Sequence, residues 1–394
     1  MDLYINAEEA AAQLGVSITT LYTYISRRGI RSQQVPGTKK RLYWRSDIER
    51  IRAGKGHTVI SPAVIGQQDS ELTLLTPDGP YYRGQSAIEL SESYTLEETA
   101  ALLWGVDSTS VFGDTPAVAP VKLRALYDVF KDATLADKAI GILPSIERAN
   151  PRAYDLSHEG MCRTGADLMR WYAAFFTDRE KTSCEPLHIQ TAAVCNGGDE
   201  VADLIRRILV ISADHGFGAG TYAVRAVAST GVTPYRSVLA GFAIAPGRRN
   251  VLGAIGAIIR LLSELTTSAD PQSVIAKRMQ EGEDLPGFRI AWPYVNGDPR
   301  ARAVLKHLQR IRGDDPGVAK ALAAFDYAEA ELGRYPGFGM VNELVARVIG
   351  LPSRECLYPL GRCAGWVAHS IERYAAADAD PPVANYRGIL PKTS

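Results

Sequence analysis

Hydrophobic residues recur at three- and four-residue spacing along most of the chain, and this pattern predicts a mainly helical fold. The helical pattern runs from about Thr95 nearly to the C-terminus, and glycine and proline separate its segments. A strand-rich stretch at 71–75, followed by a turn at 76–80, precedes it. The clearest predicted helices are 96–104, 121–133, 165–176, 201–214, 250–265, 301–311, 318–332, 341–351 and 357–374.

The first fifty residues have a pattern of their own. Asn6 with Glu9 three residues on is a capping box that predicts a helix over Ala7–Leu14, and Gly15 ends it. A second helix follows over Ser17–Arg28, then a turn and a basic strand over Val35–Trp44, then a short helix over Ser46–Ala53. Two short helices joined by a tight turn form a helix-turn-helix. Residues 3–53 therefore resemble the small winged helix-turn-helix domain of the MerR and excisionase families.

Charge supports a nucleic-acid partner for this segment. The chain has 44 Lys and Arg against 44 Asp and Glu, but residues 1–56 hold ten basic and five acidic residues, so this segment carries +5 and the remainder −5. The second helix would lie in the major groove of double-stranded DNA, and basic residues would neutralise phosphates. A small appendage with a solvated basic face is the alternative. The candidate DNA contacts are Thr19, Thr20, Thr23, Tyr24, Arg27, Arg28, Lys39, Lys40 and Arg41.

Composition limits the remaining possibilities. With 46% hydrophobic residues the chain can bury a large core, but no apolar run reaches the length of a membrane helix. The N-terminus has no apolar signal core, and the five cysteines form no CxxC pair, so we expect a cytoplasmic protein with free thiols. Residues 53–66 contain three glycines and one proline without helical periodicity. We therefore expect a domain over 1–55, a linker over 56–66 and a large helical domain over 67–394.

Several motifs of the helical domain occur in a characteristic order. In that order and spacing they resemble the citrate synthase family, which includes the methylcitrate synthases. The resemblance implies a homodimer of all-helical large and small domains, with a small domain at about 245–355 inserted in the large one. The family joins an acyl-CoA carbon to a 2-oxo acid. The motifs are Tyr82-Arg83-Gly84, Tyr94 to Gly105, Ser212 to Gly216, Ala228 to Tyr235, Gly297 to Ala301, Gly350-Leu351-Pro352 and Gly361 to Glu372.

The resemblance assigns three groups of a carboxylate pocket. The family's Ala-Asp-His segment places its substrate histidine at His215. Its Asp-Pro-Arg segment places an arginine at Arg300, and its penultimate helix places another at Arg362. Guanidinium groups bind carboxylates in bidentate geometry, so these residues fit a small carboxylate ligand such as oxaloacetate.

The catalytic positions of the family are changed. Its first histidine loop falls at 245–254, where Asn250 is the nearest match, and its second falls at 287–294, which also lacks a histidine. The catalytic aspartate falls on Gly339, and the C-terminal arginine motif at 381–388 lacks both arginines at the expected positions. Asn250 and Glu343 are weak substitute candidates; Glu343 lies one helical turn beyond Gly339, and a surface glutamate is its plainer interpretation. Each lost general acid or base costs about 10²–10⁴ in rate.

Two functions remain open. The first is a DNA-binding regulator that senses a carboxylate in the surviving pocket and has lost catalysis. The second is a diverged citrate or 2-methylcitrate synthase, or a subunit that works in a heteromer with a complete paralogue, with acyl-CoA or CoA as ligand. A third reading treats the N-terminal domain as a protein-binding appendage. No metal, tightly bound cofactor or membrane partner is expected.

Overall fold

The structure is a computed structural model, and it describes residues 4–28, 30–35, 37–53, 69–113, 115–117, 123–247, 255–288, 293–351 and 357–376. The chain divides into two compact units. The first comprises Met1–Asp69 with Pro381–Ser394, and the second comprises Ser70–Asp380. Each unit has its own hydrophobic core. None of the helices in the described ranges is long and apolar enough to cross a membrane.

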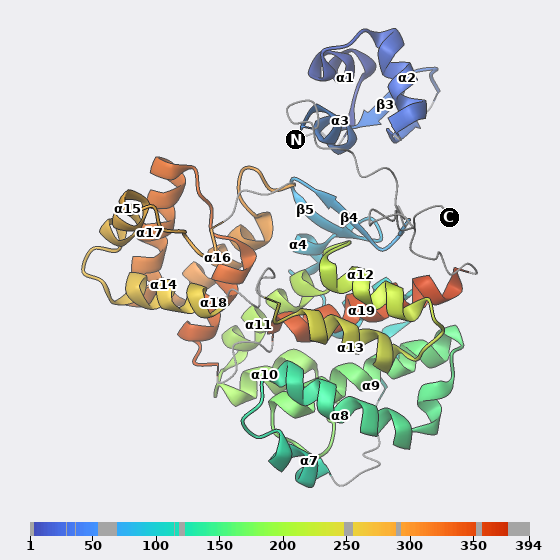
Figure 1. The fold of residues 1–394 in the computed structure, drawn as a ribbon, viewed down its shortest axis with the longest axis vertical. Coiled ribbons are helices and arrows are strands. Elements are labelled where there is room, and N and C mark those ends of the chain that lie inside the picture. Colours follow the sequence, from blue (N-terminus) through green and yellow to red (C-terminus); the bar gives the residue numbers. More distant parts are fainter. Residues whose placement is uncertain are drawn as a thin grey trace, which may run out of the picture. The chain divides into compact units, whose positions relative to one another are not determined.

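In its described residues, the N-terminal unit combines helices α1, α2 and α3 with a small sheet (Figure 1). Strand β3 lies in the middle and pairs antiparallel with β1 and β2. Its core residues are Ile5, Ala10, Ala11, Leu14, Leu21, Ile30, Tyr43, Ile48 and Ile51. The elements are β1 (Tyr4–Ile5), α1 (Ala7–Leu14), α2 (Ile18–Arg28), β2 (Ser32–Gln34), β3 (Arg41–Trp44) and α3 (Arg45–Ala53).

Local signals explain these boundaries. The capping box is present, because the Asn6 side chain accepts from the Glu9 amide at 2.9 Å and the Glu9 carboxylate accepts from the Asn6 amide. Gly15 ends α1 with a left-handed φ of 62°, a conformation that glycine adopts without strain. Asp47, on α3, accepts from the backbone amide of Arg31 and pairs with its guanidinium at 3.0 Å. This clamp fastens the start of α3 to the segment before β2.

The second unit is built almost entirely of helices that follow one small antiparallel sheet, β4-β5-β6. Its elements are β4 (Thr73–Thr76), β5 (Gly79–Tyr82), β6 (Gln85–Ser86), α4 (Ala87–Leu90), α5 (Leu96–Trp104), α6 (Ser108–Val111), α7 (Leu123–Val129), α8 (Leu135–Ala149), a 3₁₀ turn (Pro151–Tyr154), α9 (His158–Phe176), α10 (Leu187–Val194), α11 (Asp199–Ser212), α12 (Ala219–Ala228), α13 (Pro234–Ile244), α14 (Ile255–Thr267), α15 (Pro271–Gln280), α16 (Pro299–Arg312), α17 (Pro316–Leu332), α18 (Phe338–Val348) and α19 (Leu357–Ala375).

Helix α19 lies at the centre of the larger helical group and packs against α5, α9, α11, α12 and α13. Glycines permit this close packing: a Cβ on Gly365 would lie 2.3 Å from the Ala213 carbonyl oxygen. Helices α14 to α18 form a second group, seen at the left of Figure 1. This group joins the rest of the unit where α16 packs on α11.

The predicted helices are found with shifted ends. The match is complete for Leu96–Trp104, where Thr95 caps the N-terminus and Gly105 the C-terminus. The predicted helix 121–133 is shorter, Leu123–Val129 among the described residues, and the strand predicted at 71–75 lies at Thr73–Thr76. The predicted helix at 250–265 has its first five residues outside the described ranges and runs over Ile255–Thr267.

Close approach of α13 to Trp366 on α19 yields a stability prediction. A Cβ on Gly241 would lie 2.7 Å from the Trp366 ring, whereas a Cβ on Gly220 in α12 would lie 3.5 Å from the same ring. Gly241→Ala should lower the free energy of unfolding by about 1–3 kcal/mol because it overpacks the core. Chemical denaturation measures this, with Gly220→Ala as the matched control that leaves stability equal or higher. Equal losses in both variants would contradict the packing argument.

Candidate functional site

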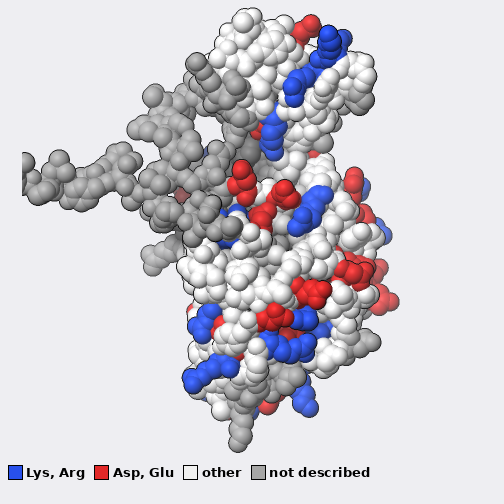
Figure 2. All heavy atoms as spheres, turned by 90° about the vertical axis from the view of Figure 1, so that its right-hand side faces the viewer, with Lys and Arg blue, Asp and Glu red and all other residues white. Residues whose placement is uncertain are grey.

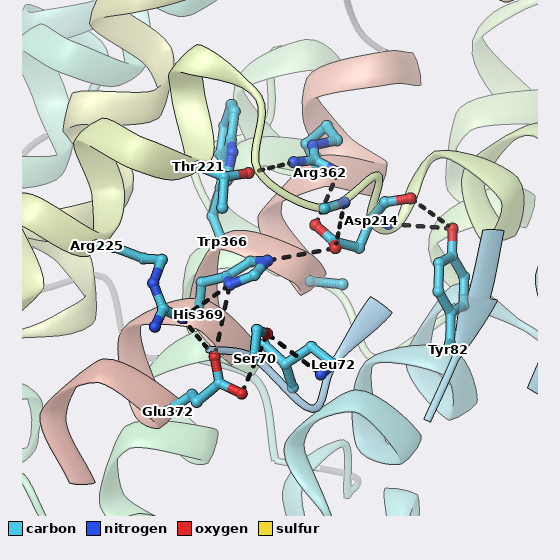
Figure 3. Close-up of polar contacts among 12 residues, drawn as sticks. Ser70, Leu72, Tyr82, Asp214, Thr221, Arg225, Arg362, Trp366, His369 and Glu372 are labelled. Atoms are coloured by element: carbon cyan, nitrogen blue, oxygen red, sulfur yellow. Dashed lines mark hydrogen bonds and ion pairs between the residues drawn. The ribbon is translucent and has the colours of Figure 1, made fainter. Parts of the chain in front are cut away.

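A buried carboxylate organises the polar centre of the second unit (Figure 3). Asp214 follows α11 and is fully buried. Its carboxylate pairs with Arg362 at 2.8 Å and lies 3.3 Å from Nε2 of His369. Burial acts to raise the pKa of Asp214, but Arg362 and His369 outweigh burial and hold this pKa well below its ordinary value. Asp214 is therefore ionised throughout the physiological pH range.

The network continues along α19 to the start of the second unit. Arg225 from α12 lies 3.2 Å from Nδ1 of His369 and pairs with the Glu372 carboxylate. Glu372 also accepts hydrogen bonds from the Ser70 hydroxyl at 3.2 Å and the Glu71 amide at 2.8 Å. Asp214, His369, Arg225 and Glu372 thus connect α11, α12, α19 and the segment before β4.

The predicted ligand residue His215 comes directly after this carboxylate. Its Nε2 lies 2.9 Å from the hydroxyl oxygen of Tyr294. Burial, together with the positive charges of Arg300 and Arg362, lowers the pKa of His215 well below its ordinary value. His215 is therefore a neutral imidazole at pH 7, and the structure brings it within electrostatic reach of both predicted arginines.

Arg300 lies at the start of α16 and is held on several sides. Its Nε and Nη2 donate to the two carboxylate oxygens of Asp298 at 3.0 and 2.7 Å. The guanidinium carbon lies 5.3 Å from the Tyr294 ring centre and 4.8 Å from the Phe338 ring centre. Its position is fixed, and Nη1 is the nitrogen that these two hydrogen bonds leave available.

Arg362 is almost completely buried. Its Nη2 donates to the Thr221 hydroxyl at 2.7 Å, and Nη1 pairs with Asp214. Its Nε has no hydrogen-bond partner among the described residues. A buried N–H without a partner is costly, so Nε is the atom of Arg362 most available to an additional acceptor.

Helix α18 begins beside Arg300, because Phe338 packs on that guanidinium. Gly337 is the N-cap, and the first turn holds no acidic residue, with Gly339 where the resemblance places the aspartate. Glu343 is not a surface residue: only 3% of it is exposed, since α18 is enclosed by α14, α16 and α17. Asn250 lies outside the described residues, as do 289–292 of the second loop.

The DNA-contact candidates on α2 divide into two faces. Thr19 and Thr23 are exposed and Thr20 is half-buried. Tyr24 is half-buried and packs against the core of the N-terminal unit, and its contact with DNA stays a prediction. Tyr22 is 54% exposed and lies on the Thr19 face. The position of the buried Leu21 sets this orientation.

The hairpin between β2 and β3 carries the second group of candidates. Lys39, Lys40 and Arg41 are all exposed. Figure 2 shows basic side chains along the visible face of the N-terminal unit, whereas acidic and basic side chains are interspersed on the larger unit. Arg27 and Arg28 end α2, but their side chains lie outside the described part.

Comparison with known proteins identifies the second unit. The family model "Citrate synthase, C-terminal domain" matches residues 65–380. The chain belongs to the citrate synthase family. Citrate synthase 1 of Mycobacterium tuberculosis is 32% identical over 196 residues, which cover 46% of this chain and 44% of that protein. Citrate synthase 2 of Bacillus subtilis is 23% identical over 354 residues, which cover 81% of this chain and 93% of that protein. The match to the Mycobacterium relative thus spans less than half of its length.

Solved citrate synthases share the fold. The Thermotoga maritima enzyme superposes with a TM-score of 0.67 at 21% identity, covering 84% of this chain and 96% of that one. The Thermoplasma acidophilum citrate synthase, a ternary complex with carboxymethyl coenzyme A and oxaloacetate, superposes with a TM-score of 0.69 at 18% identity and the same coverage.

Sequence reasoning missed the partners that hold the predicted ligand residues. Asp298 and Asp214 stand within the quoted motifs, yet spacing alone does not show that they pair with Arg300 and Arg362. Tyr294 lies in the altered second loop, and its contact with His215 joins residues 79 positions apart. Among the described residues, no group of three or more His, Cys, Asp or Glu is arranged to hold a metal.

The Asp214 network yields a pH prediction. Asp214→Asn leaves Arg362 buried without its counter-charge and should lower the free energy of unfolding by about 3–5 kcal/mol at pH 7. The native pKa of Asp214 lies well below its unfolded value, near 3.8, so the stabilisation is complete above that value and decreases progressively as the pH falls from it toward the native pKa.

Chemical denaturation of both proteins between pH 7 and pH 3 measures this difference. The gap between wild type and Asp214→Asn should narrow below about pH 4. Asp178→Asn is the control, because the Asp178 side chain is 63% exposed and solvent weakens its ion pairs with Arg124 and Lys138. A gap that stays constant with pH would contradict the assignment.

Proposed function

We propose that this member of the citrate synthase family is a ligand-sensing, DNA-binding regulator rather than an ordinary citrate synthase. It binds a small carboxylate, of which oxaloacetate is the model, in the pocket of His215, Arg300 and Arg362. The observation that carries the proposal is the contrast within one site: the carboxylate-binding groups converge, while the first turn of α18 has no acidic residue.

The charges of the pocket favour an anionic ligand that also carries an uncharged oxygen. Two fixed guanidiniums supply N–H donors, and the neutral His215 supplies an uncharged hydrogen-bonding group. The Thermoplasma relative was solved with oxaloacetate, which has two carboxylates and a ketone. This ligand class fits the residues that remain.

The residues at this site do not support the condensation of an acyl-CoA with a 2-oxo acid as well as they support binding of a carboxylate. Removing a proton from an acyl-CoA methyl group needs a base next to it, and position 339 supplies no side chain. Gly337 caps α18 and Gly339 is its second residue. The helix therefore forms at this position, but neither glycine can act as the base. Loss of one such group costs about 10²–10⁴ in rate.

One observation favours the enzymatic alternative. Glu343 is buried one helical turn beyond Gly339, and a carboxylate that is kept inside a protein has a specific role or partner. A diverged synthase would use Glu343 as its base, alone or in a heteromer with a complete paralogue, and would take acyl-CoA as substrate. A homodimer is the assembly we propose for the regulator, because one winged unit binds DNA weakly.

The N-terminal unit supplies the DNA-binding part of the proposal. The exposed residues of α2 and the basic hairpin between β2 and β3 support this part of the proposal. Because the structure exposes Tyr22 on the Thr19 and Thr23 face, we add Tyr22 to the proposed contacts.

Ligand binding and turnover test the pocket together. Oxaloacetate should bind the full chain in calorimetry, and Arg300→Ala should weaken it about 10- to 100-fold because a charge-assisted contact is lost. Arg302→Ala, on the same helix but 54% exposed, is the matched control and should bind normally. No CoA should be released from acetyl-CoA or propionyl-CoA with oxaloacetate.

Turnover near 1 s⁻¹ or above, at the low end for enzymes, that is lost in Arg300→Ala would overturn the regulator. Glu343→Gln would then show whether Glu343 is the base. Absence of both binding and turnover would remove the pocket from the proposal.

DNA binding has a distinct signature in its salt dependence. Replacing Lys39, Lys40 and Arg41 together by alanine should weaken binding to a random 30-base-pair duplex and lower the slope of log K against log salt by about 2–3, since each phosphate contact contributes about 0.9. Fluorescence anisotropy with the full chain measures both quantities. Alanine at the exposed Lys131, Lys181 and Lys277 of the second unit is the charge-matched control. Equal weakening in both triple variants would indicate a general charge effect.

A further inference from the structure

Tyr294 lies beside the proposed ligand residues, and the motifs assign it no role. It stands just before the Asp298-Pro299-Arg300 segment, and only 8% of it is exposed. Its hydroxyl lies 2.9 Å from Nε2 of His215, and its ring lies against the guanidinium of Arg300 at 5.3 Å. Tyr294 therefore touches two of the three proposed ligand residues at once.

The protonation states in this pair are fixed. Burial raises the pKa of the Tyr294 hydroxyl above its ordinary value, so the phenol keeps its proton at every physiological pH. His215 is neutral because burial and the two arginines lower its pKa. When Nε2 of His215 carries the imidazole proton, it donates to the phenol oxygen and the phenol proton is available to a third group.

We propose that Tyr294 donates a hydrogen bond to the 2-oxygen of a bound 2-oxo acid, and that His215 orients its hydroxyl for this contact. The inference rests on the carboxylate pocket proposed above and adds the residue that selects among carboxylates. Tyr294 distinguishes acids that carry an oxygen at carbon 2 from acids of equal charge that lack it.

The division of charge in the pocket supports this role. Carboxylates are best bound by guanidinium groups, and Arg300 and Arg362 provide them. A ketone oxygen carries no charge and gains from a neutral donor in a site that is shielded from water. Tyr294 and His215 are neutral groups that lie beside Arg300 and contact each other. The second loop carries no histidine, and the Tyr294 phenol is a neutral donor at its end.

The opposite role makes a different prediction. If the Tyr294 hydroxyl merely occupied the hydrogen-bonding position of His215, a ligand would have to displace it. Removal of the hydroxyl would then strengthen binding. The direction of the change in affinity therefore distinguishes a Tyr294 hydroxyl that donates to the ligand from one that the ligand must displace.

The test is Tyr294→Phe in the full chain, titrated by calorimetry with oxaloacetate, malate and succinate. These three acids have equal charge and carry a ketone, a hydroxyl or no oxygen at carbon 2. Phenylalanine keeps the ring against Arg300 and removes only the hydroxyl. Tyr127→Phe is the matched control, because Tyr127 is a buried tyrosine of α7 whose hydroxyl donates to the Arg179 carbonyl. Thermal unfolding of each variant shows that it is folded.

The wild-type chain should bind oxaloacetate more tightly than succinate. Tyr294→Phe should weaken oxaloacetate about 5- to 20-fold and change succinate less than about 2-fold, so the discrimination collapses. Tyr127→Phe should change neither. Unchanged or tighter oxaloacetate binding in Tyr294→Phe overturns the donor role and leaves the pocket intact. If the wild-type chain binds none of the three acids, the proposed function fails and the role of Tyr294 fails with it.

Discussion

The burial of one ionised carboxylate, Asp214, determines how the second unit is assembled. A carboxylate without water is tolerated only when cations and N–H groups surround it. Arg362 and His369 come from α19, and the Gly216 amide donates to the same carboxylate at 2.9 Å. Gly216 has a φ of 61°, which permits the tight turn that this hydrogen bond closes. His215 lies in that turn, so the contacts that Asp214 makes also fix the backbone of His215.

This dependence also explains what the sequence could and could not predict. Helix α5 was predicted to the residue because Thr95 and Gly105 carry local capping signals. His215, Arg300 and Arg362 were found from motifs, and they converge. Their counter-ions were not found, since ion pairs between distant segments depend on packing rather than on spacing.

Periodicity alone left the exposure of two side chains undetermined. Helix α18 is buried on nearly every side, so the position of Glu343 relative to Gly339 could not distinguish an exposed from a buried glutamate. On α2, the aromatic residues Tyr22 and Tyr24 lie two positions apart and therefore on different faces. Which of them meets solvent is decided by the packing of Leu21 and Ile25 in the small core of the N-terminal unit.

The contact between Glu372 and the residues Ser70 and Glu71 has a mechanical consequence. Ser70 is the first residue of the second unit, so the chain that arrives from the N-terminal unit is anchored directly in its polar centre. Glu372, Arg225, His369 and Asp214 form an unbroken series of polar contacts from that anchor to the turn that holds His215. The beginning of the second unit and the turn that holds His215 are therefore joined by side chains as well as by the backbone.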